Sequence, residues 1–341
     1  MNCRLFKCYP ACAIVWLFVI CQCIYRPTQA SEYVYFTKDK FNDTVQAYGL
    51  ISSSFVFKHT DNQTNISDEV FIIYLPGDNI YRDFEDSIHC SWAYTPNFLK
   101  RLLDEIPNSV LIRTCSEYKS QTIEWLKKHT VVKQEKSIAV EKLEGRVREV
   151  QLLLDGMIAK GADPRKIFVV GHSFGGWVSL VLAKQSPLKL NAVIVSAPSS
   201  SQRVDMNRVH ADIAQTSHAC SQLGSGFDQY VCQLRDTEQF KLFTDVMKKN
   251  MDAYMDDLTN QIDYLKKDNH YMPALVFAYP TDVYNKPEQI NWLAAIPGVE
   301  FIVESCLEED GHSTFYHECF ERKNIQKITA FIINNLSVKS A

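Results

Sequence analysis

Short apolar runs recur along the chain and are separated by longer segments of mixed polarity. Most of their positions are hydrophobic in succession, without alternation between apolar and polar residues. The runs are Val70–Leu75, Ser109–Arg113, Ile167–Val170, Ala192–Val195, Ala274–Ala278 and Val299–Val303. Strands of a parallel sheet that is covered on both faces have this pattern. We therefore predict a mostly parallel sheet, and Tyr33–Lys58 has room for one or two antiparallel edge strands.

Amphipathic segments between these runs predict helices. Between residues 140 and 160 the apolar positions recur at steps of three and four residues, which is the spacing of one helical face. These positions are Val140, Leu143, Val147, Val150, Leu154 and Met157. The turn residues Gly161–Pro164 end this helix, and further helices are expected over Gly175–Lys184 and Ile325–Asn334. The alternation of strands and helices predicts a doubly wound α/β fold.

The segment 199–270 interrupts this alternation, because no strand pattern occurs within it. Its second half carries an apolar stripe at helical spacing, formed by Phe240, Phe243, Met247, Met251, Tyr254, Leu258, Ile262 and Leu265. The stripe alone favours a long helix packed on the sheet. The length of the insertion favours a lid or cap over a substrate pocket somewhere within it, and both interpretations stay open.

The first 30 residues differ from the rest of the chain. Arg4 and Lys7 precede an apolar run, Ala11–Tyr25, and small residues follow at Thr28 and Ala30. This succession is typical of a secretory signal peptide, so we expect cleavage after residue 30. The run is shorter than the roughly 20 residues of a membrane span. We expect a signal peptide at 1–30, one α/β domain at 31–341 and a secreted or periplasmic location without a stable membrane anchor. An uncleaved anchor is the alternative.

Cysteine use agrees with export. Of the eleven cysteines, those outside residues 1–30 are Cys90, Cys115, Cys220, Cys232, Cys306 and Cys319. An even number of cysteines in an exported chain indicates disulfides. Proximity in the sequence favours the pairs Cys90–Cys115, Cys220–Cys232 and Cys306–Cys319. Buried free thiols are the alternative.

Composition narrows the class of protein. The chain has 341 residues, enough for one large α/β domain or two small ones, and its hydrophobic content of 46% is ordinary for a globular protein. Its formal net charge is −4 and no Lys/Arg cluster is present, so we expect no nucleic-acid partner. No Cys/His spacing indicates a structural zinc site.

The stretch IFVVGHSFGGW, Ile167–Trp177, ends an apolar run on a serine enclosed by glycines. It contains the pattern G-x-S-x-G between a predicted strand and a predicted helix, the context of a nucleophilic serine. The glycines permit a sharp turn that lifts Ser173 to the carboxyl end of the sheet. The following helix N-terminus offers N–H groups to a developing oxyanion. A structural serine in a tight turn is the alternative.

A serine hydroxyl needs a base to become a good nucleophile. In this architecture the chain order is serine, acid, histidine. Asp282 follows the strand Ala274–Ala278, and His312 follows Val299–Val303, each in a loop at a strand's carboxyl end. We therefore assign His312 as the base and Asp282 as the acid that orients it.

Several other residues compete for these roles. Glu304 and Asp310 are alternative acids, and His317 is an alternative base. For the oxyanion hole we expect the backbone N–H of Phe174 and, from the loop after Val70–Leu75, that of Asp78. A plain Pro-Gly-Asp turn is the alternative interpretation of that loop. His172 is expected only to pack the turn.

Three stretches of the chain resemble the α/β-hydrolase family: GADPRKIFVVGHSFGGWVSLVLA, ALVFAYPTD and EEDGHSTF. The first looks like its dienelactone-hydrolase and prolyl-oligopeptidase-like branches. The resemblance covers Val70 to Asn335, apart from the insertion. It implies an α/β-hydrolase fold with a mostly parallel eight-stranded sheet, helices on both faces, a Ser–Asp–His triad and no cofactor.

The expected function is that of an exported, carboxylesterase-like serine hydrolase. Ser173 would form an acyl-enzyme with a small-molecule or peptide acyl substrate, and water would release it. Three alternatives stay open: a peptidase or amidase, acyl transfer to an acceptor other than water, and a binding protein that has kept the fold without catalysis.

Overall fold

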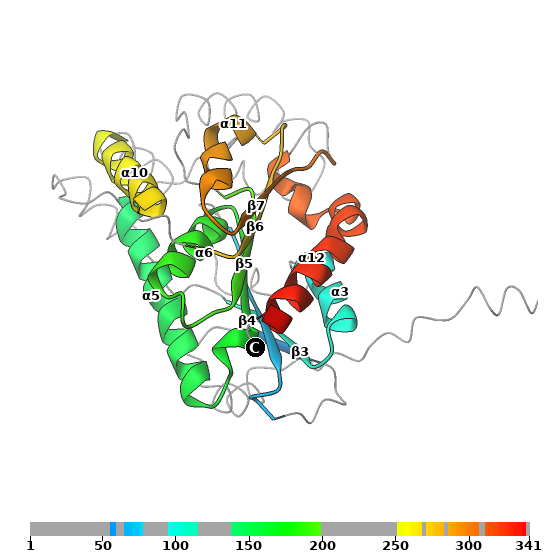
Figure 1. Cartoon of the computed structure of the whole chain (residues 1–341). Helices are drawn as coiled ribbons and strands as arrows, with labels where there is room; N and C mark the ends of the chain where they lie inside the picture. Colours follow the sequence, from blue (N-terminus) through cyan, green and yellow to red (C-terminus); the bar gives the residue numbers. More distant parts are fainter. Residues whose placement is uncertain are drawn as a thin grey trace, which may run out of the picture.

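The computed structural model describes residues 55–58, 65–77, 95–114, 138–198, 251–267, 271–282, 286–306 and 311–338. In these ranges one seven-stranded sheet runs through the middle of the molecule in the order β1-β3-β2-β4-β5-β6-β7 (Figure 1). The strands are β1 (Phe55–Lys58), β2 (Val70–Leu75), β3 (Ser109–Arg113), β4 (Ile167–His172), β5 (Ala192–Ser196), β6 (Ala274–Ala278) and β7 (Val299–Val303).

The sheet is mostly parallel, as the sequence predicts. Only β1 pairs antiparallel, in register from Phe55 opposite Arg113 to Lys58 opposite Val110, while the other neighbouring pairs are parallel. β1 is thus one antiparallel edge strand of the kind expected within Tyr33–Lys58. Residues 33–54 lie outside the described residues, and the eighth strand stays a prediction.

Helices cover both faces of the sheet (Figure 1). They are α3 (Asn97–Glu105), α5 (Ile138–Ala159), α6 (Phe174–Gln185), α10 (Met251–Lys266), α11 (Pro287–Ile290) and α12 (Glu318–Val338), with short 3-10 turns η2 (Pro164–Lys166), η4 (Asn291–Ala295) and η5 (Gly311–Tyr316). On one face α5, α6 and α10 pack together, and on the other α12 packs against α3.

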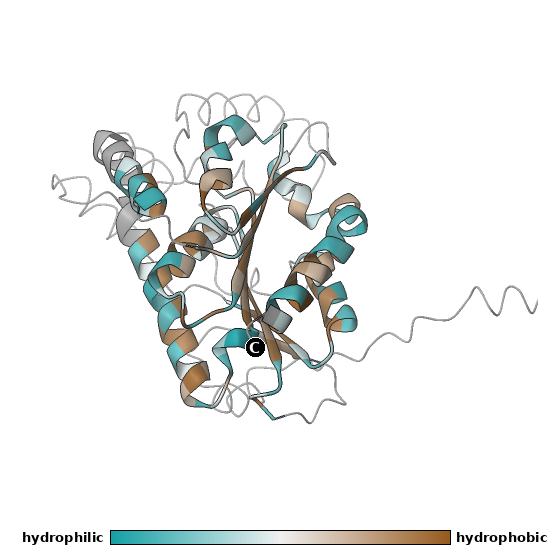
Figure 2. Ribbon diagram, in the orientation of Figure 1, coloured by the Kyte–Doolittle hydropathy of each residue, from teal (hydrophilic) through white to brown (hydrophobic). Residues whose placement is uncertain are grey.

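Two apolar layers hold the sheet between these helices. Successive side chains of a strand point to opposite faces, so Phe71 and Ile73 join one layer while Ile72 and Tyr74 join the other. All four are fully buried. In Figure 2 the strands are brown and the outer sides of the surrounding helices are largely teal. The continuous apolar runs therefore arise from burial on both faces.

The edge strand β7 departs from this pattern. Its side chains are only partly buried, and Val303 is 54% exposed. The sequence predicts a strand covered on both faces, but among the described residues β7 has a neighbouring strand on one side only. Position at the edge of the sheet explains the difference.

The helices agree with the predicted ones at their centres and differ at some ends. The predicted face of α5 is buried from Leu143 to Met157. α12 begins at Glu318, seven residues before the predicted start, because its first turns, ECFERKN, are too polar to show an apolar period. α3 is absent from the sequence prediction, although its buried residues have helical spacing: Phe98, Leu99, Leu102 and Leu103.

Only the end of the long insertion is described. α10 lies against α5 and α6, and its Ile262 and Leu265 are buried in the core. Trp177 of α6 donates from its indole nitrogen to Gln261 at 2.6 Å. These contacts fit the interpretation of a helix packed on the domain. Residues 199–250 lie outside the described residues, so the lid stays a prediction.

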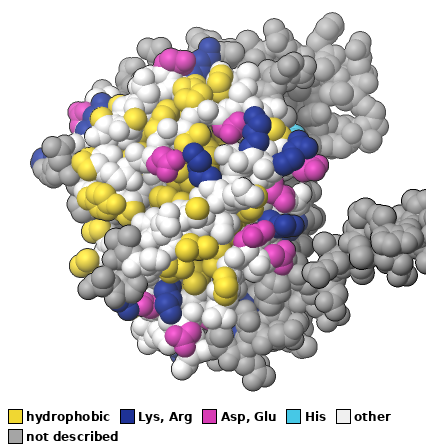
Figure 3. Space-filling view, turned by 45° about the vertical axis from the view of Figure 1, so that its right-hand side comes forward, with side chains coloured by type: hydrophobic (Ala, Val, Ile, Leu, Met, Phe, Trp, Pro, Cys, Tyr) yellow, Lys and Arg dark blue, Asp and Glu magenta, His cyan; other side chains and the backbone are white. Residues whose placement is uncertain are grey.

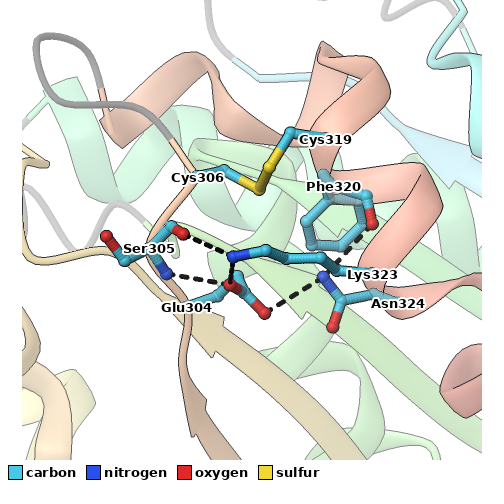
Figure 4. Close-up of a disulfide and its surroundings, with 7 residues drawn as sticks. All are labelled: Glu304, Ser305, Cys306, Cys319, Phe320, Lys323 and Asn324. Atoms are coloured by element: carbon cyan, nitrogen blue, oxygen red, sulfur yellow. Dashed lines mark hydrogen bonds and ion pairs between the residues drawn. A yellow bond between two sulfur atoms is a disulfide. The ribbon is translucent and has the colours of Figure 1, made fainter.

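A disulfide joins Cys306, after β7, to Cys319 in the first turn of α12 (Figure 4). This pair agrees with the predicted one. Beside it, the carboxylate of Glu304 pairs with Lys323 at 2.9 Å and accepts from the Ser305 N–H. The other predicted pairs, Cys90–Cys115 and Cys220–Cys232, lie outside the described residues.

On the face drawn in Figure 3, acidic and basic side chains are interspersed with apolar ones. In the described ranges, no helix has the length and apolar character that crossing a membrane requires.

Candidate active site

Ser173 lies in a sharp turn between β4 and α6. Its backbone has φ 54° and ψ −124°, a conformation that non-glycine residues rarely adopt. The turn is held by its N–H, which donates to the Ser196 carbonyl at 2.9 Å, and by its carbonyl, which accepts from Trp177 at 3.2 Å. Strain of this kind persists only where the surrounding structure fixes it, and it clusters at functional sites.

The glycines around Ser173 are required by close packing. A Cβ on Gly175 would lie 2.2 Å from the Leu75 carbonyl oxygen, and one on Gly171 would lie 2.3 Å from the Gly175 carbonyl oxygen. Neither backbone atom can give way without moving a strand or a helix. The G-x-S-x-G pattern thus fixes both the turn and its contact with the end of β2.

His312 approaches Ser173 from the other end of the chain. It lies in η5, at the carboxyl side of the sheet, and its Nε2 is 2.8 Å from Ser173 Oγ. Ser173 is 7% exposed, and the His312 side chain is 15% exposed. An imidazole at this distance can accept the hydroxyl proton, so the geometry meets the requirement for a nucleophile and its base.

Asp282 completes the constellation from the end of β6. Its Oδ2 is 3.0 Å from His312 Nδ1, and its side chain is completely buried. A carboxylate accepts only, so Nδ1 donates and Nε2 is left free to accept from Ser173. The two loops are tightly joined, because a Cβ on Gly311 would lie 2.5 Å from the Asp282 backbone nitrogen.

Solved structures share this architecture. A peroxisomal α/β-hydrolase of Saccharomyces cerevisiae matches with a TM-score of 0.52 and 10% identity, over 82% of each chain. A 2-hydroxy-6-oxo-6-phenylhexa-2,4-dienoate hydrolase of Rhodococcus matches with a TM-score of 0.52 and 13% identity, over 82% of this chain and 94% of the other. The chain has the α/β-hydrolase fold.

A family model described as serine aminopeptidase, S33, matches residues 133–240, which include the Ser173 turn. An esterase of Pyrococcus furiosus is also similar, at 14% identity over 90% of this chain and 92% of the other, with a TM-score of 0.49. No curated protein matches the chain in sequence. The α/β-hydrolase fold and the family model together support a hydrolase.

The alternative acid Glu304 and the alternative base His317 lie in other surroundings than Asp282 and His312. Glu304 faces Lys323 and Asn324, at 2.9 and 3.4 Å, on the side of the disulfide (Figure 4). His317 is exposed, just before α12. Asp310 lies outside the described residues. Among the residues that the structure describes, His312 and Asp282 are thus the histidine and the carboxylate that are linked to Ser173.

The oxyanion side of the site is described in part. Phe174 is the first residue of α6, so its N–H belongs to the helix N-terminus beside Ser173. Gly77 lies directly against the serine, because a Cβ there would be 2.9 Å from Ser173 Cβ. Buried Arg146 donates to the Pro76 carbonyl at 3.4 Å and lies over the Phe174 ring. Asp78, the second predicted donor, lies outside the described residues.

His172 has a larger part in the site than the sequence predicts. Its Nε2 lies 2.8 Å from the carbonyl oxygen of His312, and its ring stacks on Phe315 at 5.7 Å. Burial, together with the neighbouring His312, lowers the pKa of His172 to about 3. No sequence pattern could indicate this contact, and the position next to Ser173 is the only signal that singles the residue out.

Proposed function

We propose that the chain is a serine hydrolase with Ser173 as nucleophile, His312 as general base and Asp282 as the acid that orients the base. The observation that supports this most directly is the pair of contacts made by the His312 ring. Its Nε2 lies 2.8 Å from Ser173 Oγ, and its Nδ1 lies 3.0 Å from Asp282 Oδ2. The strained backbone of Ser173 is a second, independent support.

The reaction has two halves. Ser173 Oγ attacks the substrate carbonyl while His312 Nε2 takes its proton, and Asp282 stabilises the imidazolium that results. The oxyanion accepts from the N–H of Phe174 and, by the sequence prediction, from that of Asp78. His312 then gives the proton to the leaving group. Water attacks the acyl-Ser173 ester with the same base, and the free acid leaves.

Carboxylic esters are the proposed substrates. An alkoxide needs less help from His312 to leave than an amine does, and this difference favours ester cleavage. Peptide or amide cleavage is the second candidate, and the description of the matching family model, serine aminopeptidase, favours it.

The proposed location is extracytoplasmic. The disulfide between Cys306 and Cys319 supports an oxidising compartment, where such bonds form and persist. The pattern of residues 1–30 supports the same conclusion.

The test of the proposed function is reaction of the purified chain with a fluorophosphonate, followed by mass mapping of the adduct. We expect one adduct on Ser173, and none in the Ser173→Ala variant. That variant should keep its fold but retain only the ~10³–10⁴-fold acceleration that binding and the oxyanion hole supply. His317→Gln is the matched histidine control and should react at the wild-type rate.

Turnover of p-nitrophenyl esters and of aminoacyl p-nitroanilides then separates esterase from peptidase. Faster turnover of the anilides would replace the ester proposal by the peptidase one. A folded, disulfide-bonded chain that neither reacts with the probe nor cleaves either substrate class would overturn the serine mechanism.

A further inference from the structure

Three functional segments meet at the buried ring of His172: the end of β2, the Ser173 turn and the η5 segment that carries His312. The ring nitrogen Nε2 faces the His312 carbonyl oxygen at 2.8 Å. A carbonyl oxygen can only accept, so Nε2 must carry the proton and donate it. The main chain of the base is therefore hydrogen-bonded to the residue next to the nucleophile.

The other ring nitrogen continues the chain of hydrogen bonds. With the proton on Nε2, Nδ1 of a neutral ring is an acceptor, and the Tyr316 hydroxyl lies 3.4 Å from it. The Tyr316 oxygen in turn lies 2.7 Å from the hydroxyl of Tyr74, near the end of β2. In this arrangement Tyr74 donates to Tyr316, Tyr316 donates to His172, and His172 donates to the His312 carbonyl.

Packing leaves the His172 ring little freedom. It stacks on Phe315, with an angle of 9° between the planes, and the Tyr316 ring lies nearly perpendicular to it with the ring centroids 5.0 Å apart. A Cβ on Gly77 would lie 3.1 Å from Nδ1, so the segment after β2 closes the remaining side. The ring is fixed by neighbours from η5 and from the segment after β2, and it can fix His312 in turn.

We propose that His172 is a positioning residue, which anchors the main chain of His312 so that the imidazole stays within hydrogen-bond distance of Ser173. Asp282 holds the ring of the base, and His172 holds its backbone. The inference rests on the proposed function, because it assigns His172 a part in that same site.

The neutral state of His172 suits this task. The two imidazole rings are 5.1 Å apart, and Asp282 is the charged group that faces His312 from β6. During the reaction His312 becomes an imidazolium, and a second cation at this distance would oppose it. Because burial depresses the pKa of His172 to about 3, the ring stays neutral while the base works.

The experiment compares His172→Leu, which removes the donor, with His172→Gln, whose amide can donate at a similar reach. A displacement of about 1 Å at a base can lower the rate by ~10²-fold. We expect His172→Leu to lower kcat by about that factor with a much smaller change in KM, and His172→Gln to recover most of the loss. His317→Gln, an exposed histidine nearby, should leave both constants unchanged.

Tyr316→Phe provides a second test that keeps the apolar packing. Without its hydroxyl, the His172 ring loses the hydrogen bond at Nδ1 that helps to hold it in place, so kcat should fall by ~2- to 10-fold at constant KM, the effect of one net hydrogen bond. If His172→Leu does not fold, His172→Gln and Tyr316→Phe decide the question.

The outcomes separate this inference from the proposed function. A wild-type chain that does not label with fluorophosphonate refutes the serine mechanism itself. A wild-type chain that labels, with His172→Leu labelling and turning over at the same rate, overturns the positioning role alone. The positioning role also fails if His172→Gln is as slow as His172→Leu, or if Tyr316→Phe has full activity.

Discussion

His312 and Asp282, thirty residues apart in the sequence, are hydrogen-bonded through Nδ1 and Oδ2 at 3.0 Å. The carboxylate is completely buried, whereas the imidazole is partly exposed on the side of Ser173. A buried carboxylate needs hydrogen bonds or a countercharge to remain ionised. In the proposed mechanism His312 becomes an imidazolium that supplies such a charge, and on this proposal Asp282 stabilises the transition state more than the resting enzyme.

Asp282→Asn should therefore abolish most activity without loss of the fold. An amide at this position can donate to Nδ1 and thereby favour the wrong tautomer, in which Nε2 carries the proton and cannot accept from Ser173. The expected loss in kcat is ~10⁴-fold. Steady-state kinetics with a p-nitrophenyl ester measures it.

Glu304→Gln is the matched control, since Glu304 is the described alternative acid and pairs with Lys323 instead. It should keep kcat within about two-fold of the wild type, as surface ion pairs contribute little. If Glu304→Gln lost as much activity as Asp282→Asn, the assignment of the acid would be wrong.

Gly77→Ala should lower activity through the oxyanion side of the site. The added Cβ would lie 2.9 Å from Ser173 Cβ and 3.1 Å from His172 Nδ1, and both atoms belong to tightly packed residues. The segment after β2 must move outward, which shifts the turn that carries the predicted Asp78 donor. We expect kcat to fall by ~10²-fold, measured on the same ester.

Gly161→Ala is the control for general destabilisation. Gly161 follows the C-terminal end of α5 and has φ 103°, a conformation that alanine adopts only with strain. The substitution should lower the free energy of unfolding by ~1 kcal/mol or more and leave kcat unchanged. Equal kinetic losses in the two variants would mean that general destabilisation, not displacement of the Gly77 segment, explains the effect.

Sequence patterns predict the strands and the candidate residues at their ends. The apolar runs mark the strands, and the residues at their carboxyl ends include Ser173, Asp282 and His312, which the structure brings together. The contact between His172 and His312 joins residues 140 apart in the sequence, so no period or motif encodes it. The polar start of α12 and the half-exposed β7 likewise depend on what packs against them, which only the folded chain determines.

Removal of the disulfide should destabilise the domain and loosen the segment that carries the base. Cys306 and Cys319 are thirteen residues apart, and His312 lies between them. Closing a loop of about this length stabilises the folded state by ~3 kcal/mol in the chain-entropy account. The double variant Cys306→Ser, Cys319→Ser should lose about that free energy in urea unfolding, and its kcat should fall with little change in KM.

Wild-type protein in dithiothreitol is the companion measurement for the disulfide. It should show at least the same loss, since reduction also breaks any other disulfide in the chain. A double variant with wild-type stability and kcat would show that the contacts of Glu304, Lys323 and Asn324 alone hold the segment in place.

Acid should destabilise the wild type more steeply than His172→Gln. The pKa of His172 is lowered from 6.5 to about 3 in the folded chain by burial and by His312. Between these two values the unfolded chain binds a proton at this residue and the folded chain does not, so stability falls as the pH falls. One such proton contributes about 1.4 kcal/mol per pH unit.

Urea unfolding of both proteins at pH 7, 5.5 and 4.5 measures the difference between their free energies of unfolding. That difference should be constant above pH 6.5 and shrink by this slope below it, because glutamine does not titrate. Parallel curves across the whole range would mean that the pKa of His172 is the same in the folded and the unfolded chain, so that burial does not keep the ring neutral.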